Sequence, residues 1–193
     1  MKQKNVKLDK KELNNLGYIE KEVTFSTTKA MFLGIVCALP FIFTFGFFYR
    51  IFLIEQAYLT DVSGISFYVV FLGIIAVSTI IHELLHGVGW AISSKKGWSI
   101  IHFNINVLMP SCACKIILSQ KKYLFGVLSP FVVLGIGSII LLVVYPGTIS
   151  VLTMAINFGL AGADLVIAFY IIREKGALIA DHPTKAGYIA YRK

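Results

Sequence analysis

The sequence predicts an α-helical polytopic membrane protein with about four transmembrane helices and a small β-hairpin at the membrane surface. Of its 193 residues, 57% are apolar and only 15% are charged, whereas about 25% of the residues in a soluble domain are charged. The apolar residues gather in four runs, each about as long as a helix that crosses a bilayer. The lysines gather in the polar segments that flank these runs.

The four runs give the expected spans, which are residues 30–49, 67–92, 123–145 and 148–172. Pro40 lies inside the first run and can kink that helix. Pro146 and Gly147 form a tight turn signal between the third and fourth runs. We therefore expect one four-helix transmembrane domain over residues 30–172 and no separate soluble domain.

Polar segments before, within and after this domain set its expected orientation. The segments 1–29, 93–122 and 173–193 are rich in lysine and arginine, whereas the linker 50–66 carries only Arg50. In a four-span topology all three basic segments fall on one side, and basic segments favour the cytoplasmic side. The sequence thus predicts a multi-pass protein of the cell membrane with a cytoplasmic N-terminal segment and a cytoplasmic tail.

The net charge of +8 has a simple explanation in this setting. Basic segments next to apolar spans suit a protein that faces an anionic lipid leaflet. The lysines form no single stripe, and no nucleic-acid-binding motif accompanies them. We expect the lipid bilayer as a partner and no nucleic acid.

Two stretches outside the spans favour extended structure. Residues 99–107 alternate partly between polar and apolar side chains and contain β-branched residues, and residues 114–118 resume this pattern after an interruption at 108–110. These two stretches predict a β-hairpin at the membrane surface. Residues 18–25 are rich in strand-forming residues and could form one short strand.

The second run carries the motif that indicates chemistry, His82-Glu83-Leu84-Leu85-His86. Histidines four residues apart lie on one helical face, so both imidazoles can bind one metal ion. Glu83 lies between them and can take a proton from metal-bound water. Ionisable residues inside a membrane span are costly and indicate a functional site.

A catalytic zinc site uses three protein ligands and one open position, so a third ligand is required. Asp164 lies inside the fourth run, and it and Leu84 are each eight residues from the expected end of their helix. A rise of 1.5 Å per residue places both at a depth of about 12 Å. Side chains in the loops remain alternatives for the third ligand: His102, Cys112, Cys114 and His182.

Asn157 lies seven residues before Asp164, about two turns along the same helical face. Its amide could donate a hydrogen bond to a scissile carbonyl or to the oxyanion that forms from it. A polar contact between helices is an equally good interpretation.

The motif helix and Asp164 resemble the site-2 protease type of intramembrane zinc metalloprotease. More closely, the chain resembles the small bacterial membrane proteins described as putative zincin peptidases. The likeness includes the segments 128–130, 157–164 and 181–183. It implies a Zn²⁺ ion held by His82, His86 and Asp164, Glu83 as general base, and a site near the cytoplasmic face.

Two functional hypotheses follow. The first is an intramembrane zinc metalloendopeptidase that hydrolyses peptide bonds of membrane-embedded or membrane-associated proteins or peptides. The second is a non-catalytic membrane protein that binds or transports a metal ion with the same ligands. A transporter would favour several sites along a path or paired half-repeats, and the sequence contains one such site and no internal repeat.

Overall fold

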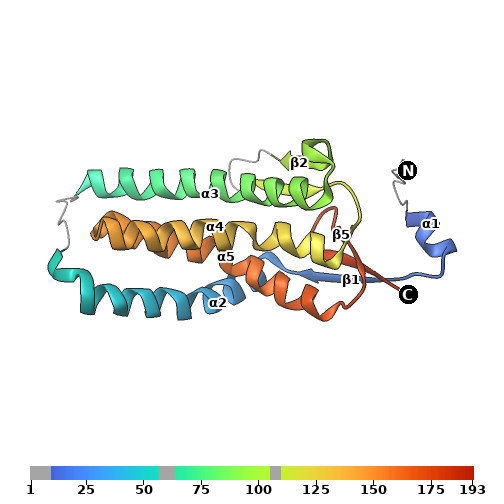
Figure 1. Ribbon diagram of the computed structural model, residues 1–193, viewed down its shortest axis with the longest axis horizontal. Coiled ribbons are helices and arrows are strands. Elements are labelled where there is room, and N and C mark those ends of the chain that lie inside the picture. The colour runs from blue at the N-terminus through green and yellow to red at the C-terminus, as the bar shows by residue number, and fades with distance from the viewer. Residues whose placement is uncertain (1–9, 57–63, 105–109) are drawn as a thin grey trace.

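The computed structural model describes residues 10–56, 64–104 and 110–193. Within these residues, four helices are long and apolar enough to cross a membrane, and small sheets lie at one end of them (Figure 1). The helices are α2 (Thr27–Phe48), α3 (Ile65–Ser94), α4 (Gln120–Val144) and α5 (Thr148–Arg173). The predicted fold class is confirmed.

The helix bounds agree with the expected spans to within a few residues, with one extension. The first candidate span covers Thr28–Leu53, because α2 continues into a π-helical turn, η1 (Tyr49–Leu53). A 3-10 turn, η2 (Ile54–Gln56), follows it. Pro40 lies within α2, and the Thr44 hydroxyl donates a hydrogen bond of 2.7 Å to the Pro40 carbonyl.

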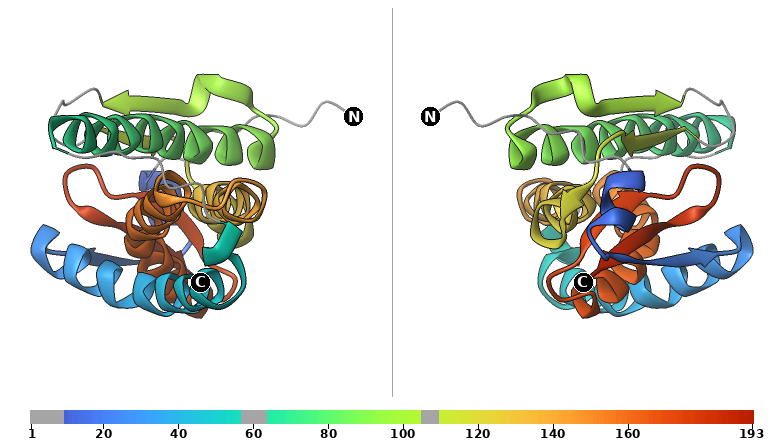
Figure 2. Two further views of the ribbon diagram at one scale, coloured as in Figure 1. Left: turned by 90° about the vertical axis from the view of Figure 1, so that its left-hand side faces the viewer. Right: turned by 90° about the vertical axis from the view of Figure 1, so that its right-hand side faces the viewer.

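The four helices pack in three layers. Seen along the bundle, α4 and α5 form a middle layer, with α3 on one side of it and α2 on the other (Figure 2). The α2–α5 contact is close, because a Cβ atom added to Gly162 would lie 2.1 Å from the carbonyl oxygen of Gly34. Glycine at both positions therefore lets the two backbones touch.

An antiparallel sheet covers one end of the bundle. Among the described residues its strand order is β1-β6-β5-β4, formed by β1 (Ile19–Phe25), β6 (Ala186–Arg192), β5 (Leu178–Asp181) and β4 (Leu118–Ser119). The short strand expected near residues 18–25 is present as β1. Strands β5 and β6 in the polar tail were not predicted, because β5 has only four residues and β6 pairs with β1, which is distant in sequence.

The expected hairpin is present with a different second strand. Strand β2 (Ile101–Asn104) pairs with β3 (Ser111–Cys114), whereas the sequence favoured 114–118 for the second strand. Gly87 lets strand β2 and the residues just before it approach α3 closely, because an added Cβ would lie 2.9 Å from the Trp98 ring and 3.1 Å from the Phe103 ring. The predicted continuation of the first strand over residues 105–107 lies outside the described residues.

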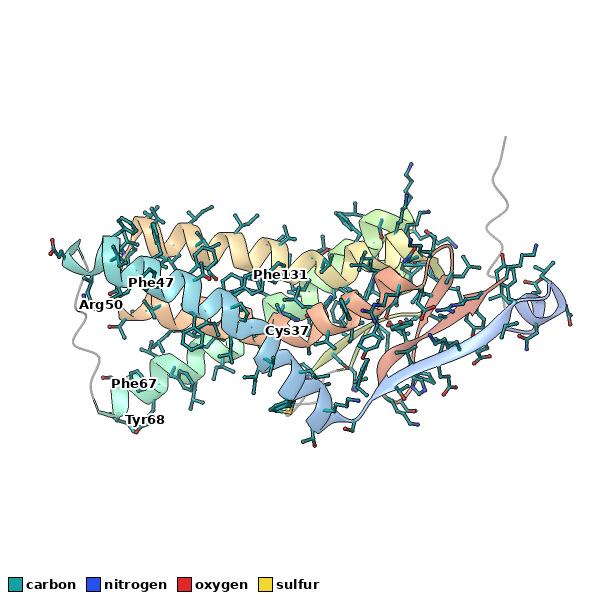
Figure 3. All side chains as sticks on the ribbon, turned by 90° about the horizontal axis from the view of Figure 1, so that it is seen from below. Cys37, Phe47, Arg50, Phe67, Tyr68 and Phe131 are labelled. Atoms are coloured by element: carbon teal, nitrogen blue, oxygen red, sulfur yellow. The ribbon has the colours of Figure 1, made fainter. Side chains whose placement is uncertain are left out.

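Polar and charged side chains gather at the end of the bundle that carries the sheets (Figure 3). The other elements at this end are a short helix, α1 (Lys10–Asn15), and a 3-10 turn, η3 (Gly97–Ile100). Arg50 after α2 and Phe67 and Tyr68 near the start of α3 lie at the opposite end. The described parts of the three basic segments thus share one end of the molecule, as their charge predicted.

Glu174 joins the sheet to the last helix. Its buried carboxylate accepts a hydrogen bond of 3.0 Å from Lys21 of β1 and another from Arg192 of β6. Burial opposes ionisation, but these two charged donors outweigh it and hold the pKa of Glu174 below its ordinary value. The ionised carboxylate therefore stabilises the folded state.

Replacing Glu174 with glutamine is expected to lower the free energy of unfolding by about 1–2 kcal/mol at pH 7, because the charge-assisted bonds become neutral ones. A lowered folded-state pKa gives stabilisation that is complete above about pH 4.3 and is lost as the pH falls through the folded value. Thermal unfolding in detergent should show a wild-type advantage that shrinks below that pH. The exposed Glu55→Gln is the control, and a pH-independent difference at Glu174 would contradict this account.

Candidate metal centre

The two motif histidines share one buried face of α3. His82 and His86 are 5% and 7% exposed, and Ser78, Gly89 and Trp90 continue the same buried stripe. The helical spacing of four residues places the two Nε2 atoms 3.2 Å apart. The sequence thus aims both imidazoles at one point inside the apolar bundle.

Asp164 of α5 completes a three-residue cluster. Its Oδ2 lies 2.9 Å from His82 Nε2, and its Oδ1 lies 3.5 Å from His86 Nε2. Leu84 and Asp164 lie ten and nine residues before the ends of α3 and α5, so they lie about 15 and about 14 Å from those ends. The predicted match in depth therefore corresponds to a direct contact.

A backbone carbonyl of α4 fixes the orientation of His86. His86 Nδ1 donates a hydrogen bond of 2.9 Å to the Gly126 carbonyl oxygen, which leaves the Nε2 lone pair directed at the cluster. This bond requires close helices. A Cβ atom at Gly126 would lie 2.1 Å from Trp90 Cδ1, and one at Gly89 would lie 2.2 Å from Ser129 Oγ.

Trp90 supports the same imidazole from its other side. Its ring stacks on His86 with centroids 5.5 Å apart and an interplanar angle of 17°. Trp90 Nε1 in turn donates a hydrogen bond of 3.0 Å to the Tyr123 carbonyl oxygen. Residues of α3 and α4 therefore hold His86 in one orientation.

The three side chains fit a zinc ion. The ligand atoms of His82, His86 and Asp164 lie within 4.8 Å of one another, and the contacts of 2.9–3.5 Å compare with about 3.3 Å between ligands of a tetrahedral zinc site. Within the described part of the chain, Asp164 Oδ2 and His82 Nδ1 are buried and make no hydrogen bond. A buried carboxylate oxygen that lies 2.9 Å from an imidazole nitrogen without a hydrogen bond is in an arrangement that a shared cation would satisfy.

The family described as "Putative zincin peptidase" matches residues 75–178, which is more than half of the chain. The chain belongs to this family. The matched segment of the zincin family contains the whole cluster, Glu83 and the β2–β3 hairpin. Searches of curated proteins and of solved structures gave no match.

Strand β3 positions the motif glutamate of this zincin-family chain. Glu83 Oε2 accepts a hydrogen bond of 2.6 Å from the backbone N–H of Cys112. This contact could not be predicted from the sequence, because every residue except proline carries a backbone N–H. Gly87, one helical turn after Glu83, was the available signal for a hairpin packed closely on α3.

Asp181, which lies in the 181–183 segment of the family likeness, forms with Tyr123 a second polar group, for which the sequence predicted no role. Asp181 of β5 accepts hydrogen bonds from the Tyr123 hydroxyl and from the Cys114 N–H. Burial raises the pKa of Asp181 to about 6, although both hydrogen bonds favour its ionised form.

The loop alternatives for the third ligand lie outside the cluster. His102 is exposed on β2, and His182 Nδ1 accepts hydrogen bonds from Thr184 and Lys185. Burial raises the pKa of the Cys112 and Cys114 thiols to about 12 and about 11, so both are protonated at neutral pH. The His182 side chain is 7% exposed.

Asn157 takes part in a contact between helices. Its Nδ2 donates a hydrogen bond of 2.7 Å to Ser138 Oγ of α4. Its Oδ1 is buried and makes no hydrogen bond to the described residues. The interhelical interpretation thus describes one end of this side chain, and a contact with substrate stays a prediction.

Proposed function

We propose that the protein is an intramembrane zinc metallopeptidase, in which His82, His86 and Asp164 hold the metal and Glu83 is the general base. The observation that carries this proposal is the convergence of two imidazoles and a carboxylate within 4.8 Å in a chain of the zincin family. The cluster lies between helices long and apolar enough to cross a membrane, so the proposed substrates are membrane-embedded or membrane-associated proteins or peptides.

The proposed reaction is hydrolysis of a peptide bond. A zinc ion at the cluster would act as a Lewis acid and lower the pKa of a water molecule to about 7. Glu83, fixed by the Cys112 N–H, would take a proton from the attacking water at its carboxylate and pass that proton to the leaving amine. The Gly126 carbonyl and Trp90 would keep His86 aligned through this cycle.

The proposed orientation places the sheet-bearing end of the bundle in the cytoplasm. Lys21, Lys95, Lys96, Arg173 and Arg192 belong to elements at that end, and the positive-inside rule favours the cytoplasm for them. The site would then lie closer to the cytoplasmic face than to the opposite face. A site-2-protease-like peptidase with this topology would act on segments near the inner leaflet.

Metal analysis of purified protein tests the ligand set. Wild-type protein should hold about one zinc ion per chain, and His86→Ala and Asp164→Ala should each lower zinc affinity by more than about 100-fold, because a site with three protein ligands would lose one of them. The control is His102→Ala, which removes an exposed histidine outside the cluster.

The outcomes of this measurement separate the alternatives. Zinc retained in both cluster variants would contradict the site, and zinc lost in His86→Ala but kept in Asp164→Ala would place the third ligand elsewhere. Fragments of membrane proteins that appear with the wild type and not with His86→Ala would support a peptidase. Bound zinc without any such fragments would favour the non-catalytic metal-binding function.

A further inference from the structure

The outer edge of strand β3 presents two backbone N–H groups away from its partner β2. Lys115 N donates to the Ile100 carbonyl oxygen at 2.7 Å, and β2 pairs with β3 in an antiparallel register. Backbone groups alternate in direction along a strand, so the N–H groups of Cys112 and Cys114 point away from β2.

Carboxylates from two different elements accept these two N–H groups. Glu83 of α3 accepts from Cys112, and Asp181 of β5 accepts from Cys114. The other oxygen of Asp181 accepts from the Tyr123 hydroxyl of α4. β3 is therefore linked to the proposed general base at one residue and to an Asp181–Tyr123 pair two residues later.

We propose that Asp181 is a positioning residue, which together with Tyr123 holds β3 in the place where the Cys112 N–H fixes the Glu83 carboxylate. The restraint of β3 by Asp181 and Tyr123, called the β3 clamp below, does not depend on the function of the protein. Its consequence for catalysis rests on the proposed function of Glu83. Among the described residues, Asp181 accepts hydrogen bonds from Cys114 and Tyr123, which are not members of the metal cluster.

The physical basis of the proposal is restraint. A glutamate side chain has several rotatable bonds, and a short hydrogen bond from a fixed donor selects one arrangement. A donor on an unpaired strand edge is fixed only if the strand itself is anchored, and Asp181 supplies an anchor from the four-stranded sheet. A second hydrogen bond, from Tyr123, fixes the orientation of Asp181 in turn.

The chain offers a direct probe, because it contains only three cysteines. Protein labelled with ¹⁵N-cysteine in nanodiscs should give amide resonances from Cys112, Cys114 and Cys37, the last lying in α2 as an internal reference. Hydrogen exchange of each amide then reports its hydrogen bond separately.

In Asp181→Ala we expect the amides of both Cys112 and Cys114 to exchange about tenfold faster or more, with Cys37 and the zinc content unchanged. Asp181→Asn should preserve slow exchange, because Asn Oδ1 can accept from Cys114 and its Nδ2 can donate to the Tyr123 oxygen. Tyr123→Phe should give a smaller increase in the exchange rates of the same two amides. This variant replaces Asp181→Ala in the test if Asp181→Ala does not fold. The control is Glu55→Gln, an exposed carboxylate outside the sheets.

Faster exchange at Cys114 alone would overturn the proposal, since β3 would then not transmit the restraint to Cys112. Equal acceleration of all three amides would overturn it as well, because it would indicate general destabilisation. With a membrane peptide that the wild type cleaves, Asp181→Ala should lower kcat about tenfold with KM unchanged. If Glu83→Gln cleaved that peptide normally, the proposed function would be wrong. The exchange rates of the Cys112 and Cys114 amides would still test the β3 clamp.

Discussion

Replacing Glu83 with glutamine is expected to abolish peptide cleavage and to leave zinc bound. Glutamine keeps the size of the side chain and can still accept the hydrogen bond from the Cys112 N–H. Its neutral amide cannot take a proton from water, and loss of a general base lowers the rate by about 10²–10⁴-fold. The measurement compares new N-termini among membrane proteins of cells that express either form, together with the zinc content of both purified proteins.

The control for this experiment is Glu55→Gln, which removes an exposed carboxylate outside the cluster. That variant should cleave and bind zinc as the wild type does. Cleavage by Glu83→Gln at the wild-type rate would show that the proposed mechanism is wrong. Loss of zinc in Glu83→Gln would mean that Glu83 contributes to metal binding, contrary to the role assigned to it.

Replacing Gly162 with alanine is expected to weaken both folding and metal binding. The new Cβ would lie 2.1 Å from the carbonyl oxygen of Gly34 and 2.7 Å from its carbonyl carbon. Backbone atoms cannot rotate away as a side chain can, so α2 and α5 must separate. Asp164 lies two residues further along α5 and would move with it. We expect a loss of about 3 kcal/mol in stability and a clear fall in zinc affinity, measured by thermal unfolding and zinc titration.

Gly159 provides a matched control on the same helix. A Cβ atom added there meets nothing within 4 Å. Gly159→Ala should therefore be neutral, or stabilising by up to about 1 kcal/mol through helix propensity. Equal effects of the two substitutions would show that the Gly34–Gly162 contact is not what holds α5 in place.

The long helices could be predicted from the sequence because each one contains an apolar run about as long as a membrane span. The sheets could not, because their pairing depends on distant partners. Strand β5 has four residues, and β6 pairs with β1 from the other end of the chain. In the hairpin, the small side chains of Ser111–Cys114 lack strand propensity, so the sequence favoured the branched residues that follow them.

The cluster of side chains was open to prediction for a similar reason. His82, Glu83 and His86 follow helical spacing, and Asp164 is the single acidic residue in the fourth run. The contacts that support this cluster could not be predicted, because two of them use backbone atoms, the Gly126 carbonyl and the Cys112 N–H. Those atoms occur at every residue, so only the fold shows which of them lies at the site.

The pairing of β1 with β6 sets an order of events during synthesis. Ile19 pairs with Arg192 and Phe25 with Ala186, so the partners are about 160–170 residues apart and the four candidate membrane spans of the described residues lie between them. Strand β1 leaves the ribosome first but can pair only after the last helix has been inserted. If one helix failed to cross, the two strands would emerge on opposite faces of the bilayer and stay unpaired. Pairing of β1 with β6 therefore stabilises chains in which both strands lie on the same face of the bilayer, relative to chains in which one helix has failed to cross.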